Sequence, residues 1–143
     1  KFFLERKFKT WITPHSKEFL RLFPHLICRT NVELAIKAAK EFNIGVLLKG
    51  ANSIVADNKK AWQLFGTDHQ TARAGLGDLL SGFVAGSSAI DLANGRNLTT
   101  EFFAKYILIH SYAAFMCKKG SDASAIGNKL SKLMRNRKLR QIS

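Results

Sequence analysis

The spacing of apolar residues alternates between strand-like and helix-like in the first third of the chain. Thr10–Thr13 predicts a short strand that the following proline ends. Helical spacing then predicts two helices, over Lys17–Phe23 and over Asn31–Phe42. Ser16 and Asn31 are the candidate N-caps of these helices, because short polar side chains can accept hydrogen bonds from first-turn amides.

A continuous apolar run, Ile44–Leu48, follows the second predicted helix. Such a run is typical of a strand that is buried on both faces, as in a parallel sheet covered by helices. Ser53–Ala56 and Ala61–Phe65 predict two more strands, and the turn Asp57–Lys60 between them predicts a hairpin. Strands that alternate with helices in this way indicate an α/β fold with a parallel core and a hairpin excursion.

Helical patterns dominate the rest of the chain. After a polar loop over Gly66–Gly77, a helix rich in small residues is predicted over Asp78–Leu92. Thr99 or Thr100 caps a long helix to about Lys119, and a basic amphipathic helix is predicted over Ala123–Leu139. One side of the long helix is lined by Phe103, Ile107, His110, Ala114 and Cys117. The chain offers fewer strands than a doubly wound domain normally has, so we expect an edge of the sheet to be missing.

Charge and composition narrow the possible partners. The 143 residues suit one domain or a piece of one, and the net charge is +13, from 23 Lys and Arg against 10 Asp and Glu. Much of this charge lies near the two ends, without a nucleic-acid-binding signature, so a solvated basic face is favoured over a nucleic-acid domain. The two cysteines, Cys28 and Cys117, form no disulfide framework, and no Cys-x-x-Cys pattern indicates structural zinc.

The apolar stretches are too short to span a membrane, and no signal-peptide pattern is present. We therefore expect no membrane partner and a cytoplasmic location. The chain does not begin with Met, so it is treated as a possible piece of a longer protein.

Two candidate functional segments follow predicted strands. Thr13–Glu18 comes after the first strand, and ligands of open α/β sheets bind outside the carboxyl ends of strands. His15 in this segment is either a hydrogen-bonding contact to a substrate or an ordinary surface histidine. Lys49–Ser53 comes after the buried strand and places a lysine and a glycine turn where a phosphate or nucleotide could lie. The alternative is that Lys49–Ser53 is only the entry turn of the hairpin.

The third candidate is the stretch Ala74–Asp78, which opens the helix of small residues. Glycine lets a backbone turn sharply and approach a ligand, and a helix N-terminus presents amides that hold anions. The amides of Gly75, Leu76 and Gly77 are a candidate anion hole, and the Asp78 carboxylate is a candidate base beside it. The alternative is that Asp78 is an ordinary N-cap.

Together, the three motifs Trp11–Phe19, Val46–Asp57 and Gly75–Gly82 resemble the ADP-dependent NAD(P)H-hydrate dehydratases of the ribokinase-like superfamily. The resemblance runs from about Trp11 to the last helix, with the motifs in the family's order. It implies that residues 1–143 are the C-terminal portion of a single domain whose N-terminal units are missing. The implied fold is three layers, α/β/α, with a mostly parallel sheet and a β-hairpin.

The resemblance also implies a repair reaction. ADP would transfer its terminal phosphoryl group to the hydroxyl of hydrated NADH or NADPH, and elimination would restore the reduced nicotinamide. His15 is implied as a contact to the hydrate, and Asp78 as the base that also lies against the hydrate. The adenine nucleotide would be bound by Lys49, Gly50, Ala51, Asn52, Ser53 and Gly77. Mg²⁺ is expected on the phosphates.

The loop before Asp78 departs from the family pattern. The family usually has Gly-Asn-(Pro or Ala)-Gly-Met-Ala-(Thr or Ser)-Gly-Gly, whereas Thr67–Gly75 reads Thr-Asp-His-Gln-Thr-Ala-Arg-Ala-Gly. Asp68 adds negative charge near a polyanionic ligand, and Gln70 and Arg73 replace small residues. Two alternatives therefore stay open: a ribokinase-like kinase of a small alcohol, and an inactive basic binding remnant. The expected partners of an active chain include a separate N-terminal half or a homo-oligomer.

Overall fold

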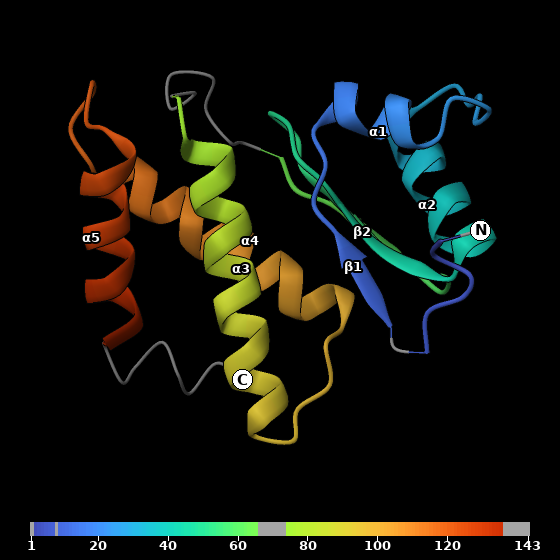
Figure 1. The fold of residues 1–143 in the computed structure, drawn as a ribbon. Coiled ribbons are helices and arrows are strands. Elements are labelled where there is room, and N and C mark those ends of the chain that lie inside the picture. Colours follow the sequence, from blue (N-terminus) through green and yellow to red (C-terminus); the bar gives the residue numbers. More distant parts are fainter. Residues whose placement is uncertain (1, 8, 66–73, 136–143) are drawn as a thin grey trace. The chain divides into compact units, whose positions relative to one another are not determined.

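The computed structural model describes residues 2–7, 9–65 and 74–135, which divide into two compact units (Figure 1). The sheet unit comprises Lys1–Gly66 and Leu98–Ala104, and the helical unit comprises Thr67–Asn97 and Lys105–Ser143. The elements in chain order are β1 (Thr10–Ile12), α1 (Ser16–Leu22), α2 (Asn31–Phe42), β2 (Ile44–Leu48), β3 (Ile54–Ala56), β4 (Ala61–Gln63), α3 (Leu76–Ala93), α4 (Thr100–Phe115) and α5 (Ala123–Arg135).

The strands of the sheet unit form one mixed sheet in the order β1-β2-β3-β4. β1 and β2 are parallel, with Thr10 opposite Ile44, and this pair is the parallel core that the apolar run predicted. β2 is buried along its whole length, as expected. β3 is antiparallel to both β2 and β4, with Val55 opposite Trp62, which confirms the hairpin. The α/β prediction is confirmed, and within the described residues the sheet has one parallel pair and two antiparallel pairs.

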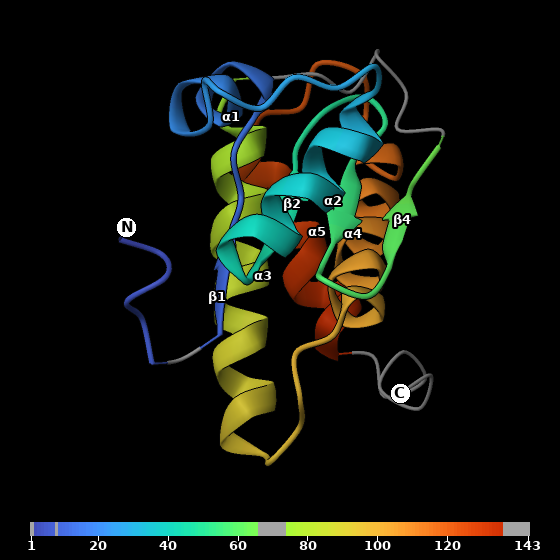
Figure 2. The same ribbon diagram turned by 90° about the vertical axis from the view of Figure 1, so that its right-hand side faces the viewer.

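Helices α1 and α2 pack on one face of this sheet, with α2 in front of β2 in Figure 2. The core between them contains Phe19 and Phe23 from the α1 segment, the alanines of α2 and alternate residues of β2 such as Val46. The ring centroids of Phe19 and Phe23 are 4.9 Å apart, and Phe23 is equally close to Phe42. Burial of this apolar surface is the main stabilising contribution to the unit.

The start of α4 also belongs to the sheet unit. Phe103 stacks on Trp11 with 3.8 Å between ring centroids, and Trp11 lies over Gly45 of β2. Lys60 of the hairpin pairs with Glu101, and this ammonium lowers the pKa of the Glu101 carboxyl to about 2. Thr99 caps α4 by accepting a hydrogen bond from the Phe102 amide at 3.2 Å, which confirms one of the two predicted caps.

The predicted N-caps of the first two helices are wrong by one residue. The N-cap of α2 is Thr30, whose Oγ1 accepts from the Glu33 amide at 3.1 Å while the Glu33 carboxylate accepts from the Thr30 amide at 3.2 Å. The N-cap of α1 is His15, not Ser16, in the same reciprocal arrangement with Glu18. The reason is the glutamate three residues after each cap, which completes a capping box that Ser16 and Asn31 cannot form.

Replacing Thr30 with alanine is expected to destabilise the chain by about 1 kcal/mol, because it removes the Oγ1 atom that accepts from the Glu33 amide. The measurement is the urea concentration at the midpoint of unfolding, compared between variants whose unfolding free energy depends equally steeply on urea. Asn31→Ala is the matched control, since Asn31 lies inside the first turn and its side chain makes no cap bond. Equal losses for the two variants would contradict the assignment of the cap to Thr30.

The helical unit is built around contacts between α3, α4 and α5. Ala113 and Ala114 of α4 and Ile126 and Leu130 of α5 form a buried cluster against the partly buried Leu79. Helix α3 begins at Leu76, two residues before the predicted start, and α4 ends at Phe115 rather than Lys119. A left-handed glycine, Gly120, lies between α4 and α5. Cys28 and Cys117 are both free thiols. Among the described helices, none has the length and apolar character needed to cross a membrane.

His110 of α4 is one of the buried titratable groups of the helical unit, with 5% of its surface exposed. Its Nε2 atom has no hydrogen-bond partner among the described residues. Burial disfavours the charged ring and lowers the pKa of His110 to about 4, although a backbone hydrogen bond with Leu76 acts in the opposite direction. The imidazole is therefore neutral near pH 7.

This burial predicts a pH-dependent stability. Between about pH 6.5 and pH 4 the unfolded chain binds a proton at His110 that the folded chain does not bind. The free energy of unfolding should therefore fall as the pH falls through this window, and the His110 part of the loss is complete near pH 4. Urea midpoints at pH 7 and pH 5 measure this, and His110→Gln should flatten the dependence. If the free energy of unfolding of His110→Gln depends on pH as strongly as that of the wild type, another group is responsible. The same conclusion follows if the surface control His25→Gln weakens the pH dependence equally.

Candidate active site

The first candidate motif lies where β1 ends and α1 begins. His15 is held by its own helix cap: its Nδ1 accepts from the Glu18 amide at 3.2 Å, and its own amide donates to Glu18 Oε2 at 2.7 Å. Its Nε2 is 3.4 Å from Glu18 Oε1, and half of the imidazole is exposed. His15 therefore has a fixed orientation and a solvent-facing edge, and its local role is the cap of α1.

The second motif lies directly beside the first. The Lys49 amide donates to the Pro14 carbonyl at 2.8 Å, and His15 and Lys49 form a parallel bridge beyond the ends of β1 and β2. The pKa of the Glu18 carboxyl is lowered, mainly by the hydrogen bond from the His15 amide and also by the charges of His15 and Lys49. The structure therefore brings His15 and Lys49 together at the carboxyl ends of β1 and β2.

The Lys49–Ser53 loop is a tight turn closed by a buried serine. Ser53 Oγ donates to the Gly50 carbonyl at 3.1 Å, and only 3% of Ser53 is exposed. The Ser53 carbonyl accepts from the Leu64 amide at 2.9 Å, so the loop is indeed the entry of the hairpin. Gly50, Ala51 and Asn52 are exposed, and a Cβ added at Gly50 would meet nothing within 4 Å. The loop is thus rigid at its base and open at its tip, where a ligand has access to the backbone.

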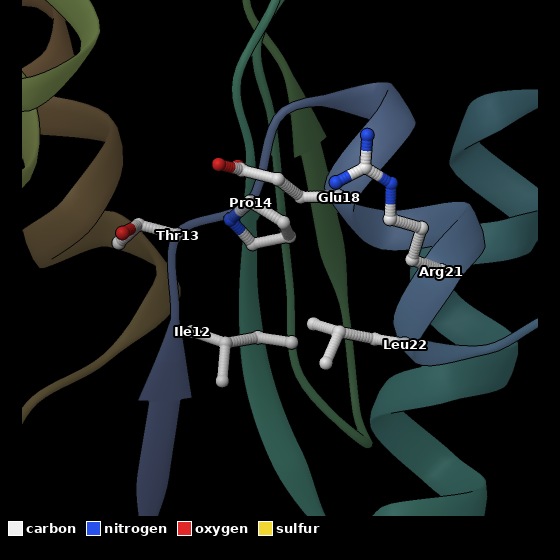
Figure 3. Close-up of a pocket in the computed structure, with 6 residues that line it drawn as sticks. All are labelled: Ile12, Thr13, Pro14, Glu18, Arg21 and Leu22. Carbon is white, nitrogen blue, oxygen red and sulfur yellow. The ribbon is translucent and has the colours of Figure 1, made fainter.

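A shallow hollow of about 410 Å³ adjoins the first motif (Figure 3). It is lined by Ile12, Thr13, Pro14, Glu18, Arg21 and Leu22. Arg21 and Leu22 were not singled out from the sequence. Arg21 and Leu22 follow Glu18 by three and four residues, so helical spacing places all three on the same side of α1. This spacing is the signal that would have identified them as lining residues.

In the helical unit, Asp78 is the third residue of α3, and its side chain makes no cap bond. The N-cap is Gly75, in a left-handed conformation with φ of +78°, so the interpretation of Asp78 as an ordinary N-cap is wrong. The Leu79 amide bonds to the Gly75 carbonyl at 2.9 Å, and the amides of Leu76, Gly77 and Asp78 precede this first intrahelical bond. Gly77 and Asp78 are exposed, so this helix end is accessible to an anion.

The site residues therefore fall into two groups. His15 and Lys49–Ser53 lie together in the sheet unit, and Gly75–Asp78 lie together in the helical unit. Most of the loop that departs from the family pattern, residues 66–73, lies outside the described residues. What the sequence predicts for Asp68, Gln70 and Arg73 therefore stays a prediction. Ala74 is an exposed turn residue next to Gly75. Among the described residues no group of three or more His, Cys, Asp or Glu side chains could hold a metal ion.

Comparisons with known proteins point to one family. A family model described as NAD(P)H-hydrate dehydratase matches residues 2–134. A relative from Nitrosopumilus maritimus, named ADP-dependent (S)-NAD(P)H-hydrate dehydratase, is 38% identical over 78 residues, which are 52% of this chain and 27% of the relative.

Two solved structures share the fold. One is an ADP/ATP-dependent NAD(P)H-hydrate dehydratase from Bacillus subtilis, with a TM-score of 0.70 and 16% identity over 94% of this chain and 50% of that one. The other is a ribokinase-like superfamily protein from Enterococcus faecalis, with a TM-score of 0.70 and 22% identity over 90% of this chain and 44% of that one. The chain thus spans about half the length of these structures. Its fold is ribokinase-like, and by the match over residues 2–134 the chain belongs to the NAD(P)H-hydrate dehydratase family.

Proposed function

We propose that this chain carries the nucleotide loop and the base of an ADP-dependent NAD(P)H-hydrate dehydratase. The observation that carries the proposal is the parallel bridge between His15 and Lys49, because it joins two of the three family motifs at the carboxyl end of the sheet. Ligands of open α/β sheets bind at that end. Residues 1–143 would be the C-terminal portion of one ribokinase-like domain, acting in the cytoplasm.

The reaction is the one that membership of this family implies. The Asp78 carboxylate takes the proton of the hydrate hydroxyl as that oxygen attacks the terminal phosphorus of ADP, and AMP leaves. The phosphate ester then departs as inorganic phosphate with loss of a neighbouring ring proton, which restores the reduced nicotinamide. Phosphoryl transfer depends mostly on positioning and charge stabilisation. The amides at the start of α3 would supply positive potential for that step.

The adenine nucleotide would lie against Lys49, Gly50, Ala51, Asn52 and Ser53, with Gly77 near its phosphates. The exposed tip of the loop and its bonded base fit this role. Mg²⁺ would be carried on the nucleotide phosphates. When bound there it would neutralise phosphate charge.

The remaining part of the domain would come from an N-terminal half, either as a separate chain or through a homo-oligomer. The chain covers 50% of the Bacillus subtilis structure, and one side of β1 has no strand partner among the described residues. An unpaired strand edge is normally covered by another segment. We therefore expect little catalysis by the chain alone and restored catalysis when an N-terminal half is added.

The test is recovery of the reduced-nicotinamide absorbance from hydrated NADH or NADPH. The chain is assayed with the N-terminal half of a relative, with ADP, with ATP or without nucleotide. ADP-dependent recovery supports the proposal. ATP-dependent phosphorylation of a small alcohol without recovery would favour a ribokinase-like kinase, and no turnover of any substrate by a folded complex would favour an inactive remnant.

The His15 position offers a prediction that separates its two roles. His15→Asn keeps an N-cap side chain for α1 but removes the imidazole, so folding should be nearly unchanged. The KM for the hydrate should rise about tenfold, the magnitude expected for one lost hydrogen bond, while the KM for ADP stays constant. Equal kinetic constants for His15→Asn and the wild type would restrict His15 to its capping role.

A further inference from the structure

We propose that a basic pocket at the amino end of the sheet is a second ligand site, which binds a phosphomonoester with a small apolar or ring-containing body. The pocket has a volume of about 400 Å³. Its polar lining consists of Arg6, Lys7, Lys9, Asn43, Asn58 and Lys59, and we call it the amino-end pocket. The inference goes beyond the proposed dehydratase reaction and does not depend on it.

The amino-end pocket is separate from the candidate active site within the same unit. It adjoins Ile44, the first residue of β2, and the hairpin turn that carries Asn58 and Lys59. The nucleotide loop begins at Lys49, after the last residue of β2. A strand of this length separates its ends by about 13 Å, so one small ligand cannot occupy both places.

The charge of the pocket is strongly one-sided. Four basic side chains line it, and no acidic side chain does. The charge of Lys9 is compensated by Asp57, because Asp57 Oδ2 lies 3.6 Å from Lys9 Nζ. Within residues 2–7, 9–65 and 74–135, Arg6, Lys7 and Lys59 form no ion pair. Three uncompensated cations around one cavity attract an anion, and arginine and lysine are the side chains that bind phosphate oxygens.

The walls of the pocket are held in place by the core. Phe3 lies 6.0 Å from Phe23 and 6.3 Å from Phe42 between ring centroids, which anchors the segment that carries Arg6 and Lys7. On the opposite wall, Asp57 Oδ1 accepts from the Lys59 amide at 2.8 Å and fixes the hairpin turn. The backbone segments that carry these cations are thus held in place, so less chain has to be ordered when a ligand binds.

Two features favour a small phosphomonoester over a long polyanion. Phe3 and Leu4 add apolar surface, on which a ring or alkyl group can pack. The amides of Asn43 and Asn58 add hydrogen-bonding groups that can fix its orientation. Asn43 is itself fixed, because it ends α2 in a left-handed conformation. A phosphate group carries up to two negative charges, which the three uncompensated cations can neutralise.

The test is a titration of the folded chain with phenyl phosphate, followed by amide chemical shifts. We expect saturable shifts at Arg6, Asn43, Ile44 and Lys59, weaker saturation with inorganic phosphate and none with phenol. Arg6→Gln/Lys59→Gln should weaken binding at least tenfold, while Lys37→Gln, an exposed lysine of α2, leaves it unchanged. Dispersed amide spectra confirm that each variant is folded.

Several outcomes would overturn the proposal. Shifts confined to Lys49–Ser53 would assign the binding to the nucleotide loop instead. Linear shifts without saturation, or equal weakening by Lys37→Gln, would reduce the effect to general charge. Tighter binding of a single-stranded oligonucleotide, lost as salt is raised, would assign the pocket to a nucleic acid backbone. None of these titrations contains hydrate, so their failure leaves the dehydratase proposal to be judged by its own assay.

Discussion

Asp78→Asn is expected to lower the rate of hydrate conversion at least about 100-fold in the domain completed with an N-terminal half. Proton transfer by a positioned carboxylate typically contributes a factor of about 10² to 10⁴. An amide has the same shape but cannot take the proton. The Asp78 side chain is exposed and makes no cap bond, so the loss should appear in catalysis rather than in folding.

The matched control is Asp122→Asn at the start of α5. Asp122 Oδ1 accepts from the Ala125 amide at 2.8 Å, and an asparagine oxygen keeps that bond. Its rate and its urea midpoint should therefore stay near those of the wild type. If Asp78→Asn retains the wild-type rate within threefold, Asp78 is not the base. If it unfolds the chain, the carboxylate has a structural role that the geometry of α3 does not predict.

Gly45→Ala is expected to destabilise the chain by about 3 kcal/mol, the upper range for overpacking of a core. The backbone of Gly45 lies against the indole of Trp11, and a Cβ at this position would overlap the ring. The indole cannot withdraw, because Phe103 stacks on it with 21° between the ring planes. The measurement is the urea midpoint, or the melting temperature where unfolding is reversible.

Two further variants test this mechanism. Gly50→Ala is the matched control for stability, because a Cβ at Gly50 would meet no atom within 4 Å. It should change the free energy of unfolding by less than about 0.5 kcal/mol. Trp11→Leu vacates the space that the new methyl needs, so the double variant should lose less stability than the sum of the single variants. Strict additivity would contradict the close packing of Gly45 on Trp11.

The strands and most helix positions could be predicted because their patterns are local. The buried run Ile44–Leu48 and the polar turn of the hairpin specify a central strand and an antiparallel pair without any long-range information. The N-caps of α1 and α2 were missed, although Thr30 and Glu33 have the spacing of a capping box. His15 is an uncommon cap residue, so a rule based on serine and asparagine selects its neighbour instead.

The candidate site could be predicted only in part. The rule that ligands bind at strand ends selected the segments of His15 and Lys49, and the structure shows that the two residues are neighbours beyond parallel strands. The register that brings the Lys49 amide to the Pro14 carbonyl is a tertiary property, which a single sequence does not specify. The amino-end pocket was missed for the same reason, since Arg6, Asn43 and Lys59 are far apart in the chain and meet only in the fold.

The most direct measurement of the central claim follows reduced nicotinamide and inorganic phosphate together in one sample. The chain is combined with an N-terminal half of the domain, hydrated NADPH and ADP. The proposed reaction predicts that NADPH and phosphate appear in equal amounts, with AMP as the third product, and that both signals disappear in Asp78→Asn. Phosphate release without recovery of NADPH, or recovery without consumption of ADP, would contradict the assignment of this chain to a hydrate dehydratase site.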